Sequence, residues 1–240
     1  MAIEQVIERS DFHHVFQPIY QLGEGKIEGY EGLLRTKHYS NPEQAFAQAE
    51  QAKKLYELDS RSIHKAVLTY QQAGFSENEG RLFLNVLPST IRNDAFPSFL
   101  DHIMNEVIAS RQQLVFEIDE QETIEDFAAF KDHIRCMKRA GVQIAIDDFG
   151  KGVSDMKRII ELEPDYIKLD RYFVEDLEHS RQKQAIIQWM AIYCRRFHIA
   201  LILEGLEDSK DIAVANGLGI PIGQGFGLGH PEPLEKQQLI

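Results

Sequence analysis

Short apolar runs with the composition of β-strands alternate in this chain with longer segments of helical periodicity. The strand-like runs lie at Leu82 to Val86, Leu114 to Ile118, Val142 to Ile146, Tyr166 to Leu169 and Ile199 to Leu203. The last run has no polar alternation, which is typical of a strand covered on both faces, as in a parallel sheet. The alternation therefore predicts an α/β fold in which helices surround a mainly parallel sheet.

The segments between these runs carry apolar residues at the spacing of an α-helix. The stripes consist of Phe99, Ile103 and Val107, of Phe127, Phe130, Ile134 and Met137, and of Ile186, Ile187, Met190, Cys194 and Phe197. Each stripe is expected to pack on the sheet.

The front of the chain departs from this alternation. The segment Gly23-Glu24-Gly25-Lys26 joins two strand-like stretches and predicts a hairpin. Such a hairpin introduces one antiparallel strand into an otherwise parallel barrel. Ser40-Asn41-Pro42-Glu43 combines a capping residue with a proline start, so a long helix is expected to begin there. The expected fold is thus α/β, a modified TIM (β/α)8-like barrel with one antiparallel strand from an N-terminal hairpin.

The composition allows one large core and argues against several classes of function. The chain has 240 residues, 43% of them hydrophobic, and its net charge of −12 opposes binding to a nucleic-acid polymer. A small anionic ligand therefore needs a local positive group or a metal ion. Cys136 and Cys194 lack Cys-x-x-Cys spacing and are expected to be buried thiols. No basic, apolar leader opens the sequence and no segment approaches about 18 uncharged apolar residues, so we expect a cytoplasmic protein without a membrane span.

Two adjacent carboxylates, Asp147 and Asp148, follow the apolar strand-like run that ends at Ile146. Two like charges side by side at a buried position are unfavourable unless a cation offsets them or they share a proton. A divalent metal site is therefore one interpretation of this pair. The other is a turn or helix cap, because Asp-Asp-Phe-Gly also suits a loop.

Polar side chains also end the other predicted strands. In a β/α barrel, the residues that follow each strand gather at one rim, where the catalytic groups of such folds are found. The residues expected at this rim are Glu31, Asn85, Glu117, Asp147, Asp148, Lys168 and Glu204. Any one of them could be a solvated charge at a loop edge, but their occurrence together at equivalent positions predicts a site.

With these residues in place, the chain resembles the EAL-type cyclic di-GMP phosphodiesterase domain over nearly its whole length. The matching segments are Phe16 to Ile19, Glu31-Gly32-Leu33-Leu34-Arg35 for the Glu-Ala-Leu motif, Asn85 in Phe83 to Val86, Glu117 to Glu120, Asp147 to Gly150, Asp165 to Asp170, Glu204 to Glu207 and Gln224 to Pro231. Each segment is weak evidence alone, but their order and spacing together are specific. The resemblance implies a single EAL-type domain over residues 1–240, with a core of about 12–234.

The resemblance also implies a role for each site residue. Glu31, Asn85, Glu117 and Asp147 would bind one metal ion, and Asp147 would bridge to a second ion that Asp148 helps to hold. Lys168 would lie beside the attacking water and the scissile phosphate, with Glu204 as general base or as support for the second ion. The remaining expected roles are metal or water contacts for Glu207 and Gln224, substrate contacts for Arg35, Gln17 and Asp170, and support of the loop after Asp148 by Glu120 and Asp170.

Oxygen ligands without His or Cys favour Mg²⁺ or Mn²⁺, and we expect two ions per site. Two such ions can activate a water for in-line attack on a phosphodiester. The expected reaction is hydrolysis of cyclic di-GMP to linear 5′-pGpG. One alternative is a non-hydrolytic receptor for the same nucleotide, which would signal to a protein partner. A further alternative is a hydrolase of another phosphate ester on the same barrel.

Four positions depart from the family pattern. Gly32 replaces the Ala of Glu-Ala-Leu, and Lys151, Val153 and Asp155 alter the loop after Asp148, which the family usually has as Thr-Gly-Tyr-Ser-Ser-Leu. Because that loop is linked in the family to the second metal ion and to dimer contacts, the changes are expected to reduce or condition activity without abolishing it. A homodimer, formed through the helix and loop after Asp148, and a regulatory protein partner are the expected assemblies.

Overall fold

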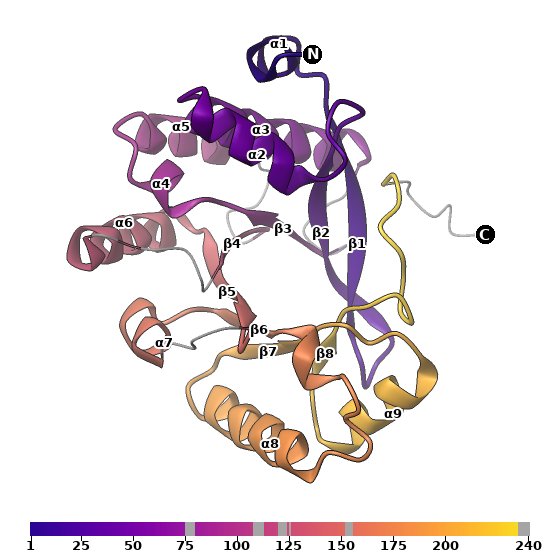
Figure 1. Cartoon of the computed structure of the whole chain (residues 1–240). Coiled ribbons are helices and arrows are strands. Elements are labelled where there is room, and N and C mark those ends of the chain that lie inside the picture. The colour runs from indigo at the N-terminus through magenta and orange to yellow at the C-terminus, as the bar shows by residue number, and fades with distance from the viewer. Residues whose placement is uncertain (75–79, 108–112, 120–123, 125, 152–155, 235–240) are drawn as a thin grey trace.

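The computed structural model describes residues 1–74, 80–107, 113–119, 124, 126–151 and 156–234. Over these residues the strands close into a barrel in which neighbours along the chain are neighbours in space (Figure 1). The strands are β1 (His13–Gln21), β2 (Lys26–Arg35), β3 (Arg81–Asn85), β4 (Leu114–Asp119), β5 (Gln143–Phe149), β6 (Tyr166–Leu169), β7 (Ala200–Leu203) and β8 (Ile222–Gly223). The predicted modified barrel is confirmed.

Strand β1 is the antiparallel strand that the hairpin predicted. It pairs antiparallel with β2 on one side and with β8 on the other, whereas all other neighbouring strands are parallel. Gly25 lies in the hairpin turn with φ +65°, a conformation that glycine adopts without strain. Because β2 to β8 all run in one direction, their carboxyl ends share one rim.

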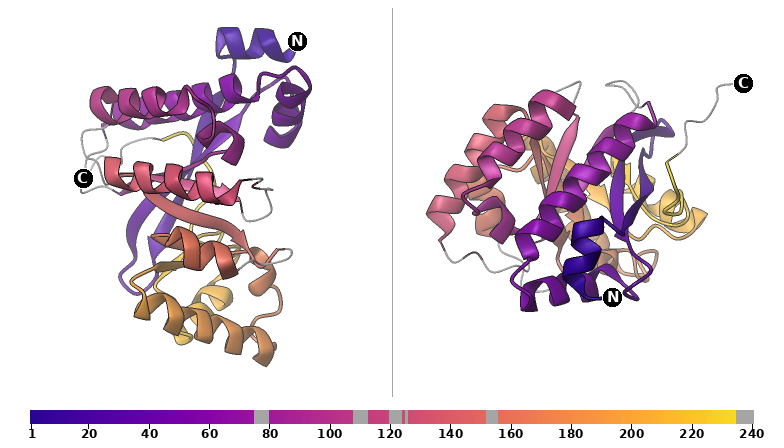
Figure 2. Two further views of the ribbon diagram at one scale, coloured as in Figure 1. Left: turned by 90° about the vertical axis from the view of Figure 1, so that its left-hand side faces the viewer. Right: turned by 90° about the horizontal axis from the view of Figure 1, so that it is seen from above.

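Helices cover the outside of the barrel, as the perpendicular views of Figure 2 show. They are α1 (Ile3–Arg9), α2 (Pro42–Gln51), α3 (Leu55–Gln72), α4 (Pro88–Ile91), α5 (Phe96–His102), α6 (Phe127–Ala140), α7 (Met156–Leu162), α8 (Arg181–Arg196) and α9 (Ser209–Gly217), with a π-helical turn η1 at Ile103–Val107 and a 3₁₀ turn η2 at Arg171–Phe173. In the described part of the chain, no helix is both long and apolar enough to span a bilayer. The cytoplasmic location stays a prediction.

The helix predicted to start after Ser40 does so, because the Asn41 side chain accepts a hydrogen bond from the Gln44 N–H at 2.9 Å. It is not one long helix, however. The chain breaks between α2 and α3 at Lys53, which has φ +56°. Helix α3 packs on β1 and β3, α2 packs on α3, and both helices line one wall of a pocket beside the rim.

Apolar side chains fill both faces of the sheet, as the uniform strand-like runs predicted. Phe83, Val115 and Ile202 belong to a small cluster inside the barrel, while Leu84 and Phe116 belong to the larger cluster under the helices. Alternate residues of each strand therefore point to opposite buried faces.

Two expectations for the helices need correction. Cys136 is exposed, because α6 packs through Phe130, Ile134 and Met137 and the residue before Met137 points away from that stripe. Cys194 is buried as expected. The stripe on α8 is divided: Ile187 and Met190 are buried, but Phe197 is 60% exposed.

Candidate active site

The ammonium group of Lys168 lies at the centre of the acidic rim. Lys168 is on β6 and its side chain is 1% exposed. Its Nζ lies 2.7 Å from Glu117 Oε1, 2.9 Å from Glu204 Oε1, 3.0 Å from Asp147 Oδ1 and 3.3 Å from Glu31 Oε2. Burial alone would lower the pKa of Lys168, but the surrounding carboxylates raise it well above its ordinary value. The lysine is therefore charged.

One ammonium does not neutralise the carboxylates that contact it. Burial raises the pKa of Glu204 to about 8, and the neighbouring Asp147 and Glu31 carboxylates add to the rise against the opposing effect of Lys168. Burial and the Glu31 carboxylate likewise raise the pKa of Glu117 well above its usual range. Such a buried excess of negative charge favours protons or further cations.

Side-chain amides connect the same carboxylates. Asn85, at the end of β3, donates from Nδ2 to Glu31 Oε1 at 3.3 Å and to Glu117 Oε2 at 3.4 Å. Gln224, just after β8, donates to Glu31 Oε2 at 2.6 Å and to Gln17 Oε1 at 3.4 Å. Gln17 in turn donates to the Gly229 carbonyl at 3.1 Å. The amides thus bridge both strands of the hairpin to the last segment of the chain.

The segment that carries Gln224 lies directly on the backbone of Leu206. The Leu206 N–H donates to the Gln224 carbonyl at 3.1 Å, and a Cβ at Gly225 would fall 2.2 Å from the Leu206 carbonyl oxygen. Gly225 has φ +159° at the edge of the region that favours glycine. This close approach explains why position 225 is a glycine.

Asp148 lies at the edge of the cluster in a left-handed conformation, with φ +55°. Carboxylate oxygens of Asp147, Asp148 and Glu204 all lie within 4.8 Å of one another. The Lys151 ammonium lies 2.5 Å from Asp148 Oδ2. Asp147 and Asp148 therefore each contact a different lysine.

The residues present fit divalent metal ions by their donor chemistry. Glu117 Oε1 and Asp147 Oδ1 are buried oxygens that have no hydrogen-bond partner in good geometry among the described residues, although Lys168 lies within ion-pair distance of both. Gln224 Oε1 is a third such atom. Glu31, Glu117 and Asp147 surround the Lys168 ammonium, and the Asn85 amide links Glu31 to Glu117. Among the described residues, Asp147, Asp148 and Glu204 are the carboxylates whose oxygens all lie within 4.8 Å of one another and could hold an ion.

The other predicted site residues lie farther out. Asp170 is buried, where its Oδ1 accepts the Tyr172 N–H at 2.8 Å and its N–H donates to the Phe149 carbonyl at 3.1 Å. Glu207 has a side chain that is 64% exposed, 4.0 Å from Arg171, outside the group around Lys168. Arg35, the last residue of β2, donates to the Leu34 carbonyl at 2.8 Å. Glu120 lies outside the described residues, as do Val153 and Asp155 of the altered loop.

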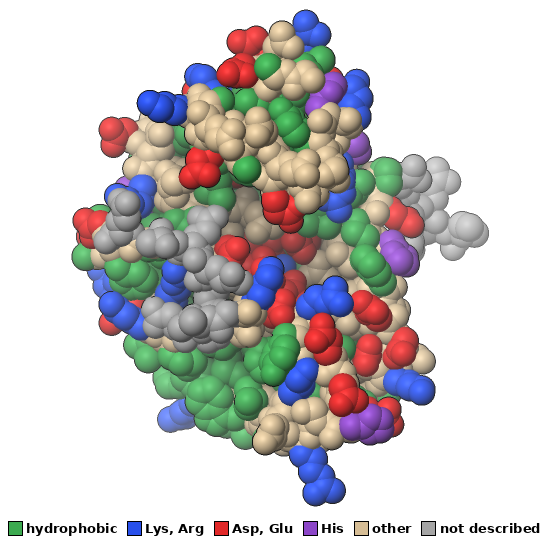
Figure 3. Space-filling view, in the orientation of Figure 1, with side chains coloured by type: hydrophobic (Ala, Val, Ile, Leu, Met, Phe, Trp, Pro, Cys, Tyr) green, Lys and Arg blue, Asp and Glu red, His purple; other side chains and the backbone are tan. Residues whose placement is uncertain are grey.

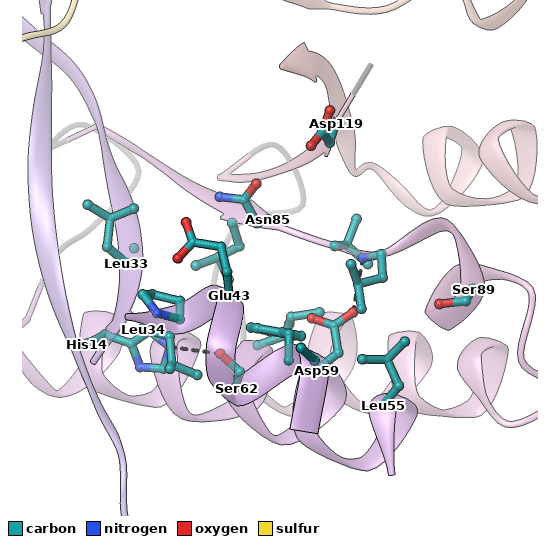
Figure 4. Close-up of a pocket in the computed structure, with 18 of the residues that line it drawn as sticks. His14, Leu33, Leu34, Glu43, Leu55, Asp59, Ser62, Asn85, Ser89 and Asp119 are labelled. Atoms are coloured by element: carbon teal, nitrogen blue, oxygen red, sulfur yellow. Dashed lines mark hydrogen bonds between the residues drawn. The ribbon is translucent and has the colours of Figure 1, made fainter. Parts of the chain in front are cut away.

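A pocket of about 640 Å³ adjoins the rim between β2, β3 and the wall formed by α2 and α3 (Figure 4). Arg35, Asn85 and Asp119 line its side toward the acidic cluster. Acidic side chains gather at a hollow on this face of the molecule in Figure 3. The pocket could receive part of a ligand whose reacting group lies at the rim.

Two buried polar residues in this pocket were not predicted from the sequence. His14 shares a 3.0 Å hydrogen bond with the Ser62 hydroxyl, and burial lowers the pKa of its imidazole to about 3. Asp59, on α3, accepts the Leu87 N–H at 3.0 Å, and burial raises the pKa of its carboxyl to about 6. The signal that could have found Asp59 is a carboxylate on the same helix face as Ile63, Ala66 and Val67.

The chain is similar to a family of known proteins and to several solved structures. The EAL domain family matches residues 1–231. The cyclic di-GMP phosphodiesterase PdeB of Shewanella oneidensis is 28% identical over 98% of this chain and 28% of its own length, and the blue light- and temperature-regulated antirepressor BluF of Escherichia coli is 26% identical over 89% and 52%. The chain thus spans only about a quarter to a half of these relatives.

A solved structure of BlrP1 from Klebsiella pneumoniae, a manganese and cyclic di-GMP complex, superposes with a TM-score of 0.84 at 28% identity, covering 92% of this chain and 56% of that one. A calcium and cyclic di-GMP complex of BlrP1 gives a TM-score of 0.81 at 27% identity, over 93% and 58%. From the extent of the family match and the closed barrel, this chain belongs to the EAL domain family.

Proposed function

We propose that this chain is a metal-dependent phosphodiesterase that opens cyclic di-GMP to linear 5′-pGpG. The observation that carries the proposal is the convergence of Glu31, Asn85, Glu117 and Asp147 around Lys168, with Asp148 and Glu204 beside them. The names of PdeB and of the BlrP1 complexes support the substrate. No expected metal ligand is replaced in this sequence.

Two divalent ions, Mg²⁺ or Mn²⁺, would supply charge that activates a water molecule and stabilises the oxygens entering and leaving phosphorus. Lys168 contacts carboxylates from four parts of the barrel, namely Glu31 on β2, Glu117 on β4, Asp147 on β5 and Glu204 after β7. It also presents a positive charge to a phosphate at the rim. Glu204 is the proposed general base, taking a proton from the attacking water at its carboxylate. The bond from phosphorus to the 3′ oxygen then breaks, so that the product keeps a 5′-phosphate.

Substrate binding depends on the same charges. The rim carries more carboxylates than ammonium groups, so it repels a dianion until divalent ions offset the excess. Arg35 lies at the pocket edge and is the proposed phosphate contact, while Gln17 and Asp170 are proposed to support the substrate from β1 and β6. The adjoining pocket is the proposed space for one base of the nucleotide.

The experiment is incubation of the purified protein with cyclic di-GMP in Mg²⁺, Mn²⁺ or chelator, with separation of the products by chromatography. We expect metal-dependent pGpG, and loss of about 10²-fold or more in Glu204→Gln and Glu31→Gln. Glu24→Gln is the matched control, because Glu24 is an exposed carboxylate in the hairpin turn, paired only with Lys26 among the described residues. A bis-aryl phosphodiester cleaved as fast as cyclic di-GMP would instead favour a hydrolase of other esters.

A cyclic di-GMP receptor without turnover is the second candidate function. BluF carries the name of an antirepressor, and in this chain Lys151 pairs with Asp148 at the proposed second-metal position. Calorimetric binding of cyclic di-GMP with no pGpG at any Mn²⁺ concentration would favour the receptor over the enzyme.

We also propose that the chain forms a homodimer, but through the exposed side of α8 and not through the helix and loop after Asp148 that the resemblance implied. This α8 face consists of Ile186, Trp189, Ile192, Tyr193 and Phe197. The rings of Trp189 and Tyr193 lie 6.0 Å apart and those of Tyr193 and Phe197 lie 4.8 Å apart, so an aromatic row follows the helix. Hydrophobic side chains gather over α7 and α8 in Figure 3. An apolar surface of this kind marks an interaction site.

Both ends of α8 are basic, since Arg181 and Lys183 lie in its first turn, which holds no acidic residue, and Arg195 and Arg196 lie in its last turn. The apolar row between these ends is therefore the part of the helix that would meet a second copy. A two-fold axis near Trp189 would bring the Trp189 side chains of the two copies together.

A further inference from the structure

We propose that Lys151 is a tethered cation that competes with a divalent ion for Asp148 and so weakens the second metal position of the proposed phosphodiesterase. The inference rests on the proposed function but concerns Lys151, one of the positions at which this chain departs from the family pattern. It predicts that the two metal positions fill at different metal concentrations.

The contact is set by a tight turn after β5. Asp148 has φ +55° and Gly150 has φ +98°, and the Lys151 N–H donates to the Asp148 carbonyl at 3.1 Å. A Cβ at Gly150 would fall 2.2 Å from the Phe173 ring, so the turn is packed closely against η2. The backbone thereby brings the Lys151 side chain back over the Asp148 carboxylate, where Nζ and Oδ2 lie 2.5 Å apart.

Lys168 pairs with Asp147, and Lys151 pairs with the adjacent Asp148. In the described part of the chain, Lys168 forms ion pairs with Asp147 and Glu204, and Lys151 forms one with Asp148. These three carboxylates are the group whose oxygens lie within 4.8 Å of one another. A divalent ion placed among them must therefore displace the Lys151 ammonium or accept a positive charge beside it.

The Lys151 side chain is able to leave. It is 53% exposed, whereas that of Lys168 is 1% exposed and fixed by its surroundings. The Lys151 ammonium is thus a weakly held, reversible occupant of the cation position beside Asp148.

The size of the effect follows from the exposure of the pair. An exposed ion pair changes an equilibrium constant by a factor of roughly one to five, and a displaced ammonium that stays nearby adds repulsion. Removal of the charge should therefore strengthen the weaker metal site by about threefold to tenfold. The stronger site, formed around Glu31 and Glu117, should change little.

The test is direct titration of the nucleotide-free protein with Mn²⁺, followed by electron paramagnetic resonance of the free ion. Wild type is compared with Lys151→Thr, with Lys151→Met, which keeps the length without the charge, and with Lys151→Arg. Lys26→Thr is the matched control, because Lys26 is also exposed and paired at 2.6 Å with a carboxylate, in the hairpin turn. We expect a lower dissociation constant at the weaker site in the Thr and Met variants only, and a smaller effect at high ionic strength.

Two results would contradict the competition between Lys151 and a divalent ion. If the weaker dissociation constant of Lys151→Thr stays within twofold of wild type, or if neither protein binds a second ion, the competition does not exist. Turnover of cyclic di-GMP by wild type together with that result would overturn this inference alone. Two-ion binding that responds to Lys151→Thr but yields no pGpG would overturn the proposed reaction and leave this inference standing.

Discussion

Asp59 accepts a hydrogen bond from the backbone N–H of Leu87 at 3.0 Å, which ties α3 to the turn that follows Asn85. Asp59 is only 2% exposed, and the Thr90 hydroxyl faces the same carboxyl. A buried carboxylate thus holds the backbone two residues beyond an expected metal ligand. It does so at a cost, because burial raises its pKa from 3.8 to about 6.

Asp59→Asn should therefore stabilise the protein at neutral pH. The folded state binds the Asp59 proton more tightly than the unfolded state does, so the group favours folding below about pH 4 and this contribution is lost as the pH rises to about 6. The amide keeps an acceptor for Leu87 without the buried charge. We expect a gain of about 1–3 kcal/mol in the free energy of unfolding at pH 7.5, measured by urea denaturation.

The pH dependence of this gain separates it from a packing effect. The difference between Asp59→Asn and wild type should become small at pH 4 and vanish below it, where Asp59 is protonated in both the folded and the unfolded state. Asp59→Ala, which leaves the Leu87 N–H without its acceptor, should instead lose about 1–3 kcal/mol. A gain in Asp59→Asn that is equal at pH 4 and pH 7.5 would contradict the assignment to charge.

The barrel could be predicted because its signals are local. The strands between Leu82 and Leu203 are short, mainly apolar runs, and the hairpin turn has its own glycine. Once the strands are parallel, their last residues must meet at one rim, so Asn85, Glu117 and Lys168 could be assigned to it without knowledge of any contact.

Other features could not be predicted because they depend on packing or on a few backbone angles. Strand β8 is only Ile222–Gly223 and carries no recognisable pattern. The contact between Lys151 and Asp148 depends on the left-handed conformation of Asp148. The hydrogen bond of Asp59 depends on the position of Leu87, which lies in a turn 28 residues farther along the chain. Cys136 was expected to be buried, but it is exposed because it lies on the side of α6 that faces away from the packed stripe.

Divalent metal should stabilise the folded protein if the acidic rim binds it. A ligand that binds only the folded state stabilises by about 2.7 kcal/mol at 100 times its dissociation constant. We expect Mn²⁺ to raise the melting temperature of wild type in scanning calorimetry, and chelator to reverse the rise. Asp147→Asn should lose most of this shift, whereas Asp132→Asn, an exposed carboxylate on α6 paired with Arg135, should keep it. An equal shift in both variants would place the metal elsewhere.

Lys168→Met should destabilise the metal-free protein strongly. It removes the ammonium that lies 2.7 Å from Glu117 and 2.9 Å from Glu204, and leaves the buried carboxylates uncompensated. Loss of one partner from a buried pair costs about 3–5 kcal/mol. We expect a loss of that size by urea denaturation in chelator at pH 8, and a smaller loss at pH 5.5, where the carboxylates take up protons. A loss that does not depend on pH would show that packing of the side chain outweighs its charge.

Trp189 lies near the middle of α8, so under a two-fold axis it would meet its own counterpart and anchor the proposed dimer. Trp189→Ala should weaken the dimer by about tenfold or more, because large aromatic side chains at the centre of an interface contribute most of its energy. Sedimentation velocity over a concentration series measures the change. Dimers that persist unchanged in Trp189→Ala would show that the copies meet through another surface.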